Sequence, residues 1–222
     1  MHTSPVRIEL DTVTLEGELT IPATAGGIVL FAHGSGSSRH SPRNRFVADV
    51  LHDAGLGTLL LDLLTTAEER DRANVFDIPL LAGRLEAATA WLATRTDTAT
   101  CRLGYFGAST GAGGALWAAA EPGSSVAAVV SRGGRPDLAA PRLAAVRAPT
   151  LLIVGGADDV VLALNRQARA ALVSCPTELA VVAGATHLFE EPGTLAEAAS
   201  LARDWFVRYL VEVSTTQGGE SS

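Results

Sequence analysis

A serine between two glycines has the residue type and spacing needed for nucleophilic catalysis. Residues 102–121 have the sequence RLGYFGASTGAGGALWAAAE, in which Ser109 follows an apolar run and precedes an alanine-rich segment. The pattern predicts a buried strand over 103–106, a tight turn at the serine and a helix after it. Glycine is expected at 107 and 111, because a side chain there would collide with the neighbouring strand or helix. Ser109 is a candidate nucleophile, although a serine flanked in this way also occurs by chance.

A serine hydroxyl is a weak nucleophile and needs a neighbouring base. His187, in the loop after the last predicted strand (178–182), is the candidate to take the Ser109 proton and return it to a leaving group. Asp158 and Asp159 follow the strand predicted over 150–154, and one of them should orient the imidazole. The chain order is therefore serine, aspartate, histidine.

These side chains must be positioned by a larger arrangement of strands and helices. Apolar and alternating runs predict strands over 6–10, 14–21, 27–32, 58–61, 103–106, 126–130, 150–154 and 178–182. Helices are predicted over 44–54, 78–94, 138–146, 162–172 and 195–213, in addition to the helix after Ser109, and 65–77 is predicted to be a loop. Strict alternation of strand and helix after an N-terminal hairpin predicts an α/β fold with a mostly parallel sheet covered by helices on both faces. The candidate residues then meet at the carboxyl ends of the strands.

Length and composition favour one globular domain. The chain has 222 residues, of which 47% are hydrophobic and 18% are charged. We expect a single domain over residues 1–213 and a disordered tail over 214–222, which is rich in small polar residues.

Charge and motif content exclude several classes of protein. The net charge of −7 disfavours nucleic-acid binding, and the absence of lysine excludes Schiff-base chemistry. No metal-ligand spacing and no dinucleotide or phosphate-binding loop occurs, so we expect no cofactor and no metal. The N-terminus lacks the apolar core of a signal peptide, and no apolar run reaches 18 residues. These features predict a cytoplasmic protein without a membrane partner. In that compartment Cys101 and Cys175 are expected to be reduced.

With these motifs in place, nearly the whole chain resembles a small, lidless α/β-hydrolase of the dienelactone hydrolase-like group. Four segments carry the resemblance: HGSGSS (33–38), GASTGAGGAL (107–116), GGADDVV (155–161) and GATHLFEEPG (184–193). The resemblance implies an eight-stranded sheet with one antiparallel strand and hydrolysis through a serine triad. Only about 20 residues join the strands at 126–130 and 150–154, so we expect no cap domain and an open site.

The resemblance also assigns individual roles. It favours Asp158 over Asp159 as the triad acid, with Asp159 in solvent or capping the following helix. It places the two backbone donors for an oxyanion on Thr110 and Ser35, whereas His33 is expected to be structural. Dienelactone hydrolase itself uses cysteine as its nucleophile, so its lactone substrate is not carried over to a chain with Ser109.

Several arginines follow the predicted site loops: Arg39, Arg43, Arg45, Arg132 and Arg135. On an acidic chain, Arg132, Arg135 or Arg39 could bind a carboxylate or phosphate on a small-molecule substrate. The alternative is that they pair with nearby acids such as Asp137 or simply lie in solvent. The remaining histidines at 2, 40 and 52 are expected at the surface.

The residues thus favour a serine hydrolase that cleaves an ester or lactone of a small substrate through an acyl-Ser109 intermediate. A peptidase or an acyltransferase could use the same three residues, because the acceptor is selected by the shape of the pocket. A non-catalytic binding protein on the same fold is a further alternative.

Overall fold

A computed structural model describes residues 1–23 and 25–211. Its strands are β1 (His2–Glu9), β2 (Thr14–Ile21), β3 (Gly27–Ala32), β4 (Gly57–Leu61), β5 (Arg102–Ala108), β6 (Val126–Arg132), β7 (Thr150–Gly155) and β8 (Thr177–Val182). Its helices are α1 (Pro42–Asp53), α2 (Arg72–Val75), α3 (Ile78–Thr94), α4 (Thr110–Ala119), α5 (Asp159–Ala171) and α6 (Thr194–Leu210), with 3₁₀ segments η1 (Glu68–Arg70) and η2 (Pro136–Ala145). The predicted tail at 214–222 lies outside the described residues.

The eight strands form one sheet in the order β1-β2-β4-β3-β5-β6-β7-β8. Strand β2 is antiparallel to both β1 and β4, and every other neighbouring pair is parallel. One strand therefore runs against the other seven, as the resemblance implied. All of the predicted strands are present.

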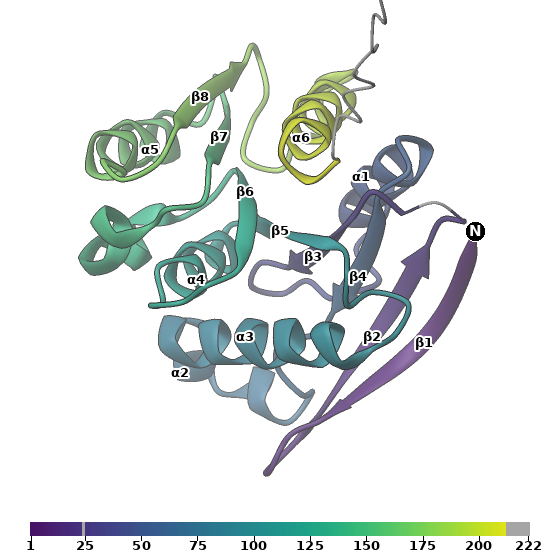
Figure 1. The fold of residues 1–222 in the computed structure, drawn as a ribbon. Helices are drawn as coiled ribbons and strands as arrows, with labels where there is room; N and C mark the ends of the chain where they lie inside the picture. Colours follow the sequence, from purple (N-terminus) through teal and green to yellow (C-terminus); the bar gives the residue numbers. More distant parts are fainter. Residues whose placement is uncertain (24, 212–222) are drawn as a thin grey trace, which may run out of the picture.

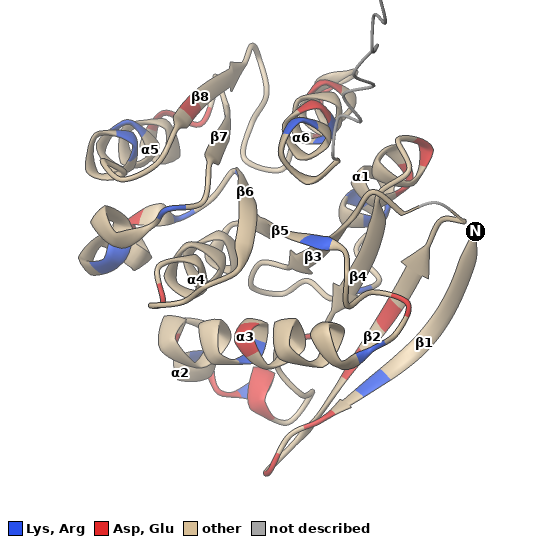
Figure 2. Ribbon diagram, in the orientation of Figure 1, with Lys and Arg blue, Asp and Glu red and all other residues tan. Residues whose placement is uncertain are grey.

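Helices cover both faces of the sheet (Figure 1). On one face, α3, α4, η2 and α5 pack on a cluster that includes Leu85, Leu116 and Leu152. On the other face, α1 and α6 pack on a cluster that includes Phe31, Phe106 and Phe206. Because β3, β4 and β7 are buried on both sides, they carry no charge, and β6 carries a single charged residue, Arg132 (Figure 2).

The ends of two elements differ from the predictions. Helix α1 begins at Pro42 because Ser41 caps it, accepting a hydrogen bond from the Asn44 N–H at 3.4 Å, and proline fits the first turn. Strand β6 extends two residues beyond the predicted end, to Arg132, which brings this side chain to the carboxyl end of the sheet.

Two predicted segments have a different local structure. The stretch predicted as a loop over 65–77 contains η1 and α2, because its polar residues act as caps: the Asp71 side chain accepts from the N–H of Ala73. The helix predicted over 138–146 is the 3₁₀ segment η2, in which Pro141 lacks the N–H that a regular α-helix would use. No segment among the described residues forms a cap over the sheet, and no described helix is both long enough and apolar enough to cross a membrane.

Candidate active site

Ser109 lies on the turn between β5 and α4 in a backbone conformation that is rare outside glycine, with φ 49° and ψ −122°. Such strain persists only where the surrounding structure enforces it, and it clusters at functional sites. Close packing around both flanking glycines holds the backbone in this conformation. A Cβ at Gly107 would collide with the backbone of Ala112, and one at Gly111 would collide with the carbonyl oxygen of Ala32. The chain thus crosses from strand to helix too tightly for a side chain at either position.

His187 is held by an acid. Its Nδ1 lies 2.7 Å from Oδ2 of Asp158, which is the first residue after the β7 turn and the N-cap of α5. An ionised carboxylate can only accept, so Nδ1 carries the proton in this bond and Nε2 is free to act as a base. Asp159 is exposed in the first turn of α5. The helix cap, one of the two roles expected for Asp159, is supplied instead by Asp158, which accepts from the N–H of Val161 at 3.4 Å.

The loop that carries His187 is fixed on both sides of the imidazole. Glu191 accepts hydrogen bonds from the backbone N–H and the hydroxyl of Thr186, at 3.0 and 2.6 Å. These bonds lower the pKa of Glu191, which keeps its carboxylate ionised. Phe189 is buried with φ 57° and anchors the other side of the loop in the core. His187 itself remains accessible, with 40% of its side chain exposed.

Ser109 and His187 line one cavity of about 170 Å³, here called the Ser109 cavity, together with residues of the loop after β3 and the start of α1. The hydroxyl of Ser109 makes no hydrogen bond to His187 in the described structure. Contacts of this kind are often long in ligand-free enzymes and tighten when substrate binds. The three candidate residues from β5, β7 and the loop after β8 are thus brought to the same edge of the sheet.

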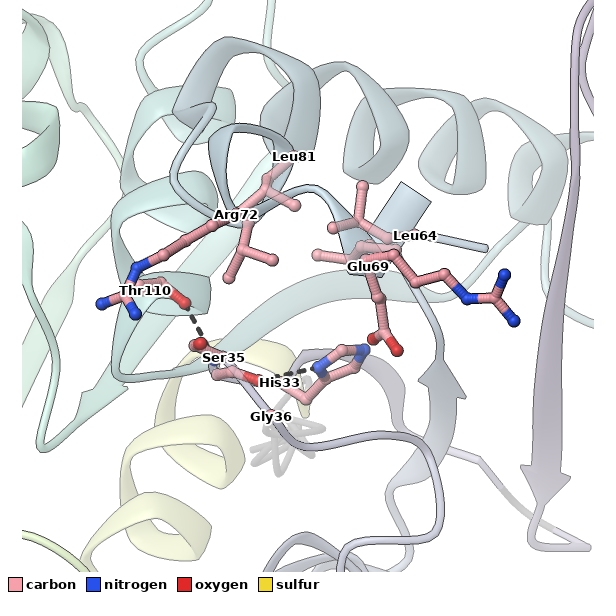
Figure 3. A pocket seen from close by; sticks show the side chains of 12 residues that line it. His33, Ser35, Gly36, Leu64, Glu69, Arg72, Leu81 and Thr110 are labelled. Carbon is pink, nitrogen blue, oxygen red and sulfur yellow. Dashed lines mark hydrogen bonds between the residues drawn. The ribbon is translucent and has the colours of Figure 1, made fainter. Parts of the chain in front are cut away.

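The loop after β3 lies against the start of α4. The backbone N–H of Ser35 donates to Oγ1 of Thr110 at 3.1 Å (Figure 3). The predicted oxyanion donors are therefore neighbours in space, and the Thr110 hydroxyl holds one of them. The sequence predicted a role for the Thr110 backbone only, and not this hydrogen bond to its side chain. The hydroxyl-bearing residue directly after Ser109 was the one sign of it in the sequence.

A second cavity, of about 300 Å³, is lined by Ser35 and Thr110 together with residues that include Leu81 of α3, and is here called the α3 cavity. Its floor contains the buried side chains of Leu63, Leu64 and Leu81, whereas charged residues from η1 and α2 lie at its rim (Figure 3). These rim residues come from the stretch that was predicted to be a loop, so local patterns contained no sign of this cavity.

His33 lines the α3 cavity and makes local contacts. Its side chain is buried, Nδ1 lies 3.0 Å from the carbonyl oxygen of Gly34, and Nε2 lies 3.6 Å from Oδ1 of Asp62. The expectation that His52 lies at the surface is wrong: only 10% of its side chain is exposed, and its Nε2 lies 2.8 Å from Oγ1 of Thr58. The reason is the helix period, which turns position 52 of α1 toward β4.

Only one of the three candidate substrate-binding arginines lines the Ser109 cavity. Arg39 forms ion pairs with Asp62 and Glu16, and Arg135 pairs with Asp137 through two bonds of 2.8 and 2.7 Å. Both are engaged by local acids, which is the alternative that the sequence left open. Arg132 lines the cavity and is 7% exposed.

No group of three or more metal-ligating side chains is arranged around a common centre within residues 1–23 and 25–211. The residues that line the Ser109 cavity include serines, an asparagine, two arginines and His187, whose imidazole is held by the Asp158 carboxylate. Such a set can take a proton from a hydroxyl and stabilise negative charge.

The chain is similar to known hydrolases in both sequence and structure. Residues 48–212 match the profile of the dienelactone hydrolase family. A solved structure described as dienelactone hydrolase from Anabaena variabilis is 56% identical, with a TM-score of 0.90 over 94% of this chain and 98% of that chain. A lidless α/β serine hydrolase from Xanthomonas campestris shares the fold with a TM-score of 0.77 at 19% identity, over 95% of this chain and 96% of that chain.

Among curated proteins, a Mycobacterium tuberculosis protein provisionally named phosphoribosyl transferase is 63% identical over 205 residues. That match covers 92% of this chain and 46% of the relative, so the chain spans about half the length of the curated relative. The family profile covers most of the chain, and the sheet, its strand order and the absence of a cap among the described residues agree with it. The chain therefore belongs to the dienelactone hydrolase family and has the α/β-hydrolase fold.

Proposed function

We propose that this protein is a serine hydrolase that cleaves a carboxylic ester or lactone of a small substrate through an acyl-Ser109 intermediate. The observation that carries the proposal is the 2.7 Å contact between Nδ1 of His187 and Oδ2 of Asp158, on a histidine that lines the same cavity as the strained Ser109. A histidine fixed in this tautomer beside a hydroxyl is the arrangement that general-base activation of serine requires.

The proposed reaction has two steps. Nε2 of His187 takes the Ser109 proton while Oγ attacks the carbonyl carbon, and the negative charge on the substrate oxygen is met by the N–H groups of Thr110 and Ser35. The imidazolium, stabilised by Asp158, then gives its proton to the departing alcohol oxygen as the carbon–oxygen bond breaks. Water repeats the sequence on the acyl-enzyme, releasing the acid and restoring the Ser109 hydroxyl.

The oxyanion step requires a small rearrangement, because the Ser35 N–H donates to the Thr110 hydroxyl before substrate arrives. The hydroxyl holds this amide in place, and the arriving oxyanion competes for it. Thr110 also begins α4, a helix of ten residues, so the positive end of its dipole faces the developing charge.

The acyl-enzyme can be tested directly with a fluorophosphonate probe. We expect one covalent adduct on Ser109 by mass spectrometry, no adduct in Ser109→Ala, and hydrolysis of short neutral esters by the wild-type protein alone. Folded wild-type protein that leaves Ser109 unlabelled and cleaves no ester would refute the hydrolase proposal and favour a binding protein.

The same triad could serve a peptidase or an acyltransferase. Supplying an alcohol or amine during ester turnover, and measuring how the acyl group divides between water and the acceptor, separates transfer from hydrolysis. Matched amide and ester substrates with a common acyl group separate a peptidase from an esterase.

The transferase name of the curated relatives applies to proteins of which this chain matches 46%. We propose that the matched half carries the hydrolase and that the activity in the name belongs to the remainder. Absence of phosphoribosyl transfer by this chain, together with labelling of Ser109, is the expected result.

A further inference from the structure

A buried arginine without a carboxylate partner among the described residues lines the Ser109 cavity. The guanidinium of Arg132 makes one long hydrogen bond, from Nη2 to Oδ1 of Asn44 at 3.4 Å, and lies 5.7 Å from the centre of the Phe189 ring. Its Nε and Nη1 are buried and have no hydrogen-bond partner in the part of the chain that the structure describes. A buried charge without a partner is costly, so its presence at a cavity needs an explanation.

The surroundings of Arg132 are electropositive. Arg43 lines the same cavity, and the described lining contains no aspartate or glutamate. Burial, with a smaller contribution from the charge of Arg43, lowers the pKa of Arg132 to about 10, so Arg132 still carries its charge at neutral pH. Helix α1 begins beside the cavity and has no acidic residue in its first turn, so its dipole adds to the positive potential. Arg43 also contacts Glu190 at 3.3 Å, but that pair is exposed and is expected to be weak.

The position of His187 tells which part of a substrate would occupy this cavity. In the proposed reaction, which this inference rests on, His187 protonates the departing oxygen, so the leaving group must lie on the His187 side of Ser109. His187 lines the Ser109 cavity and not the α3 cavity. Gly34 and Ser35 line both cavities, and the Ser35 N–H is one of the two proposed oxyanion donors, so a substrate bound there can extend into both.

We infer that Arg132, assisted by Arg43, forms a leaving-group subsite for an alcohol that carries an oxyanion, either a carboxylate or a phosphate monoester. The acyl part then lies over the leucine floor of the α3 cavity. The guanidinium donates charge-assisted hydrogen bonds to the anion, supplying the partner that Arg132 lacks among the described residues. A polar analogue without the anion would leave the buried charge unpaired, which makes the subsite selective.

The test compares acetate esters that differ only in the leaving phenol. One phenol carries a carboxylate, one a phosphate monoester and one a neutral carboxamide in the same ring position, and each kcat/KM is divided by the uncatalysed rate. We expect at least one anionic ester to be preferred over the neutral one by about 10- to 100-fold, as charge-assisted hydrogen bonds allow. Whichever ester, carboxylate or phosphate, is preferred more strongly over the neutral carboxamide identifies the anion.

Two variants assign the preference to residues. Arg132→Gln should remove most of it, and Arg43→Gln should reduce it about two- to five-fold, because Arg43 is partly exposed. Arg135→Gln is the matched control: its guanidinium is paired with Asp137 outside the cavity, so the preference should not change. The quantity compared is the ratio of anionic to neutral ester for each variant, which does not depend on the fraction of folded protein.

A second pair of esters tests which cavity receives the anion. A phenyl ester of a dicarboxylic acid carries its free carboxylate on the acyl side, and the corresponding methyl ester is its neutral match. An Arg132-dependent preference in this pair, absent from the leaving-group series, would overturn the assignment to the leaving group.

Equal rates for anionic and neutral esters in all series, or a preference that survives Arg132→Gln, would overturn the subsite. Fluorophosphonate labelling of Ser109 and cleavage of neutral esters would leave the hydrolase proposal intact in those cases.

Discussion

The carboxylate of Asp158 serves His187 and a helix at the same time. Oδ2 lies 2.7 Å from Nδ1 of His187, while Oδ1 accepts from the N–H of Val161 in the first turn of α5. The carboxylate is therefore fixed by the helix before it orients the imidazole. Capping of α5 and the tautomer of the candidate base depend on a single side chain.

This relationship predicts a large kinetic effect from a small chemical change. Asp158→Asn keeps the cap and the volume but can donate to Nδ1, which favours the wrong tautomer. We expect kcat to fall by about 10³- to 10⁴-fold, with the free energy of unfolding changed by about 1 kcal/mol or less. Steady-state ester hydrolysis and urea unfolding measure the two quantities. Asp159→Asn is the control, and a comparable loss of kcat there would contradict the role given to Asp158.

The contact between Ser35 and Thr110 predicts a role for a hydroxyl that takes no part in bond breaking. Thr110→Val removes the acceptor for the Ser35 N–H, so the loop after β3 loses the bond that positions one proposed oxyanion donor, and we expect this loss to outweigh the relief of competition for that N–H. We expect kcat to fall by up to about 100-fold with a smaller change in KM. Thr110→Ser retains the hydroxyl and should recover most of the rate. Equal activity of the serine and valine variants would show that the hydroxyl is dispensable.

The tight turn at Ser109 makes Gly111 irreplaceable. A Cβ there would collide with the backbone of Ala32 and His33, neither of which can move without disturbing β3. Gly111→Ala should lower the free energy of unfolding by about 2 to 4 kcal/mol. At Gly83, inside α3, an added Cβ would meet no atom within 4 Å outside its own helix, so Gly83→Ala should raise stability by about 0.5 to 1 kcal/mol. Chemical denaturation measures the free energy of unfolding of both variants. Relative to the wild-type protein, it should be lower for Gly111→Ala and higher for Gly83→Ala.

Arg132 should lower the stability of the ligand-free protein. Replacing it with methionine removes a buried charge that has no carboxylate partner among the described residues, so Arg132→Met should raise the free energy of unfolding by about 1 to 3 kcal/mol. Burial lowers the pKa of Arg132 to about 10, and the group is protonated in both folded and unfolded chains below that pH. The gain should therefore be nearly the same at pH 6 and pH 8. Arg135→Met, at a partly exposed pair, should change stability by less than about 1 kcal/mol. Destabilisation by Arg132→Met would contradict this account.

His52 should make stability depend on pH. Burial lowers the pKa of this histidine, more than the nearby carboxylates of Asp49 and Asp53 raise it. Between the folded pKa and the ordinary value near 6.5, the unfolded chain binds more protons than the folded one, so stability falls as the pH drops through that window. Urea unfolding over the range from about pH 7.5 to about pH 5 measures the slope. His52→Gln should flatten it, and an unchanged slope would assign the effect to other groups.

The order of the strands and of the longer helices, and the candidate triad, follow from the amino-acid sequence alone. Apolar runs specify buried strands because a strand covered on both faces excludes charge, and the glycines at 107 and 111 mark a turn that admits no side chain. Because parallel strands end at one edge of a sheet, residues after β5, β7 and β8 had to approach one another. These inferences need only local patterns and topology, whereas the choice of Asp158 over Asp159 also used the family resemblance.

Packing in three dimensions settles which arginine reaches the cavity and where the second cavity lies. Arg132 and Arg135 are the same residue type three positions apart, yet one ends β6 beside Ser109 and the other pairs with Asp137. The leucines of the α3 cavity come from the segment after β4 and from α3. The charged residues at its rim come from η1 and α2, which lie between these two segments in the sequence. The partners of a charged side chain depend on backbone direction and on residues distant in the sequence, and local composition contains neither.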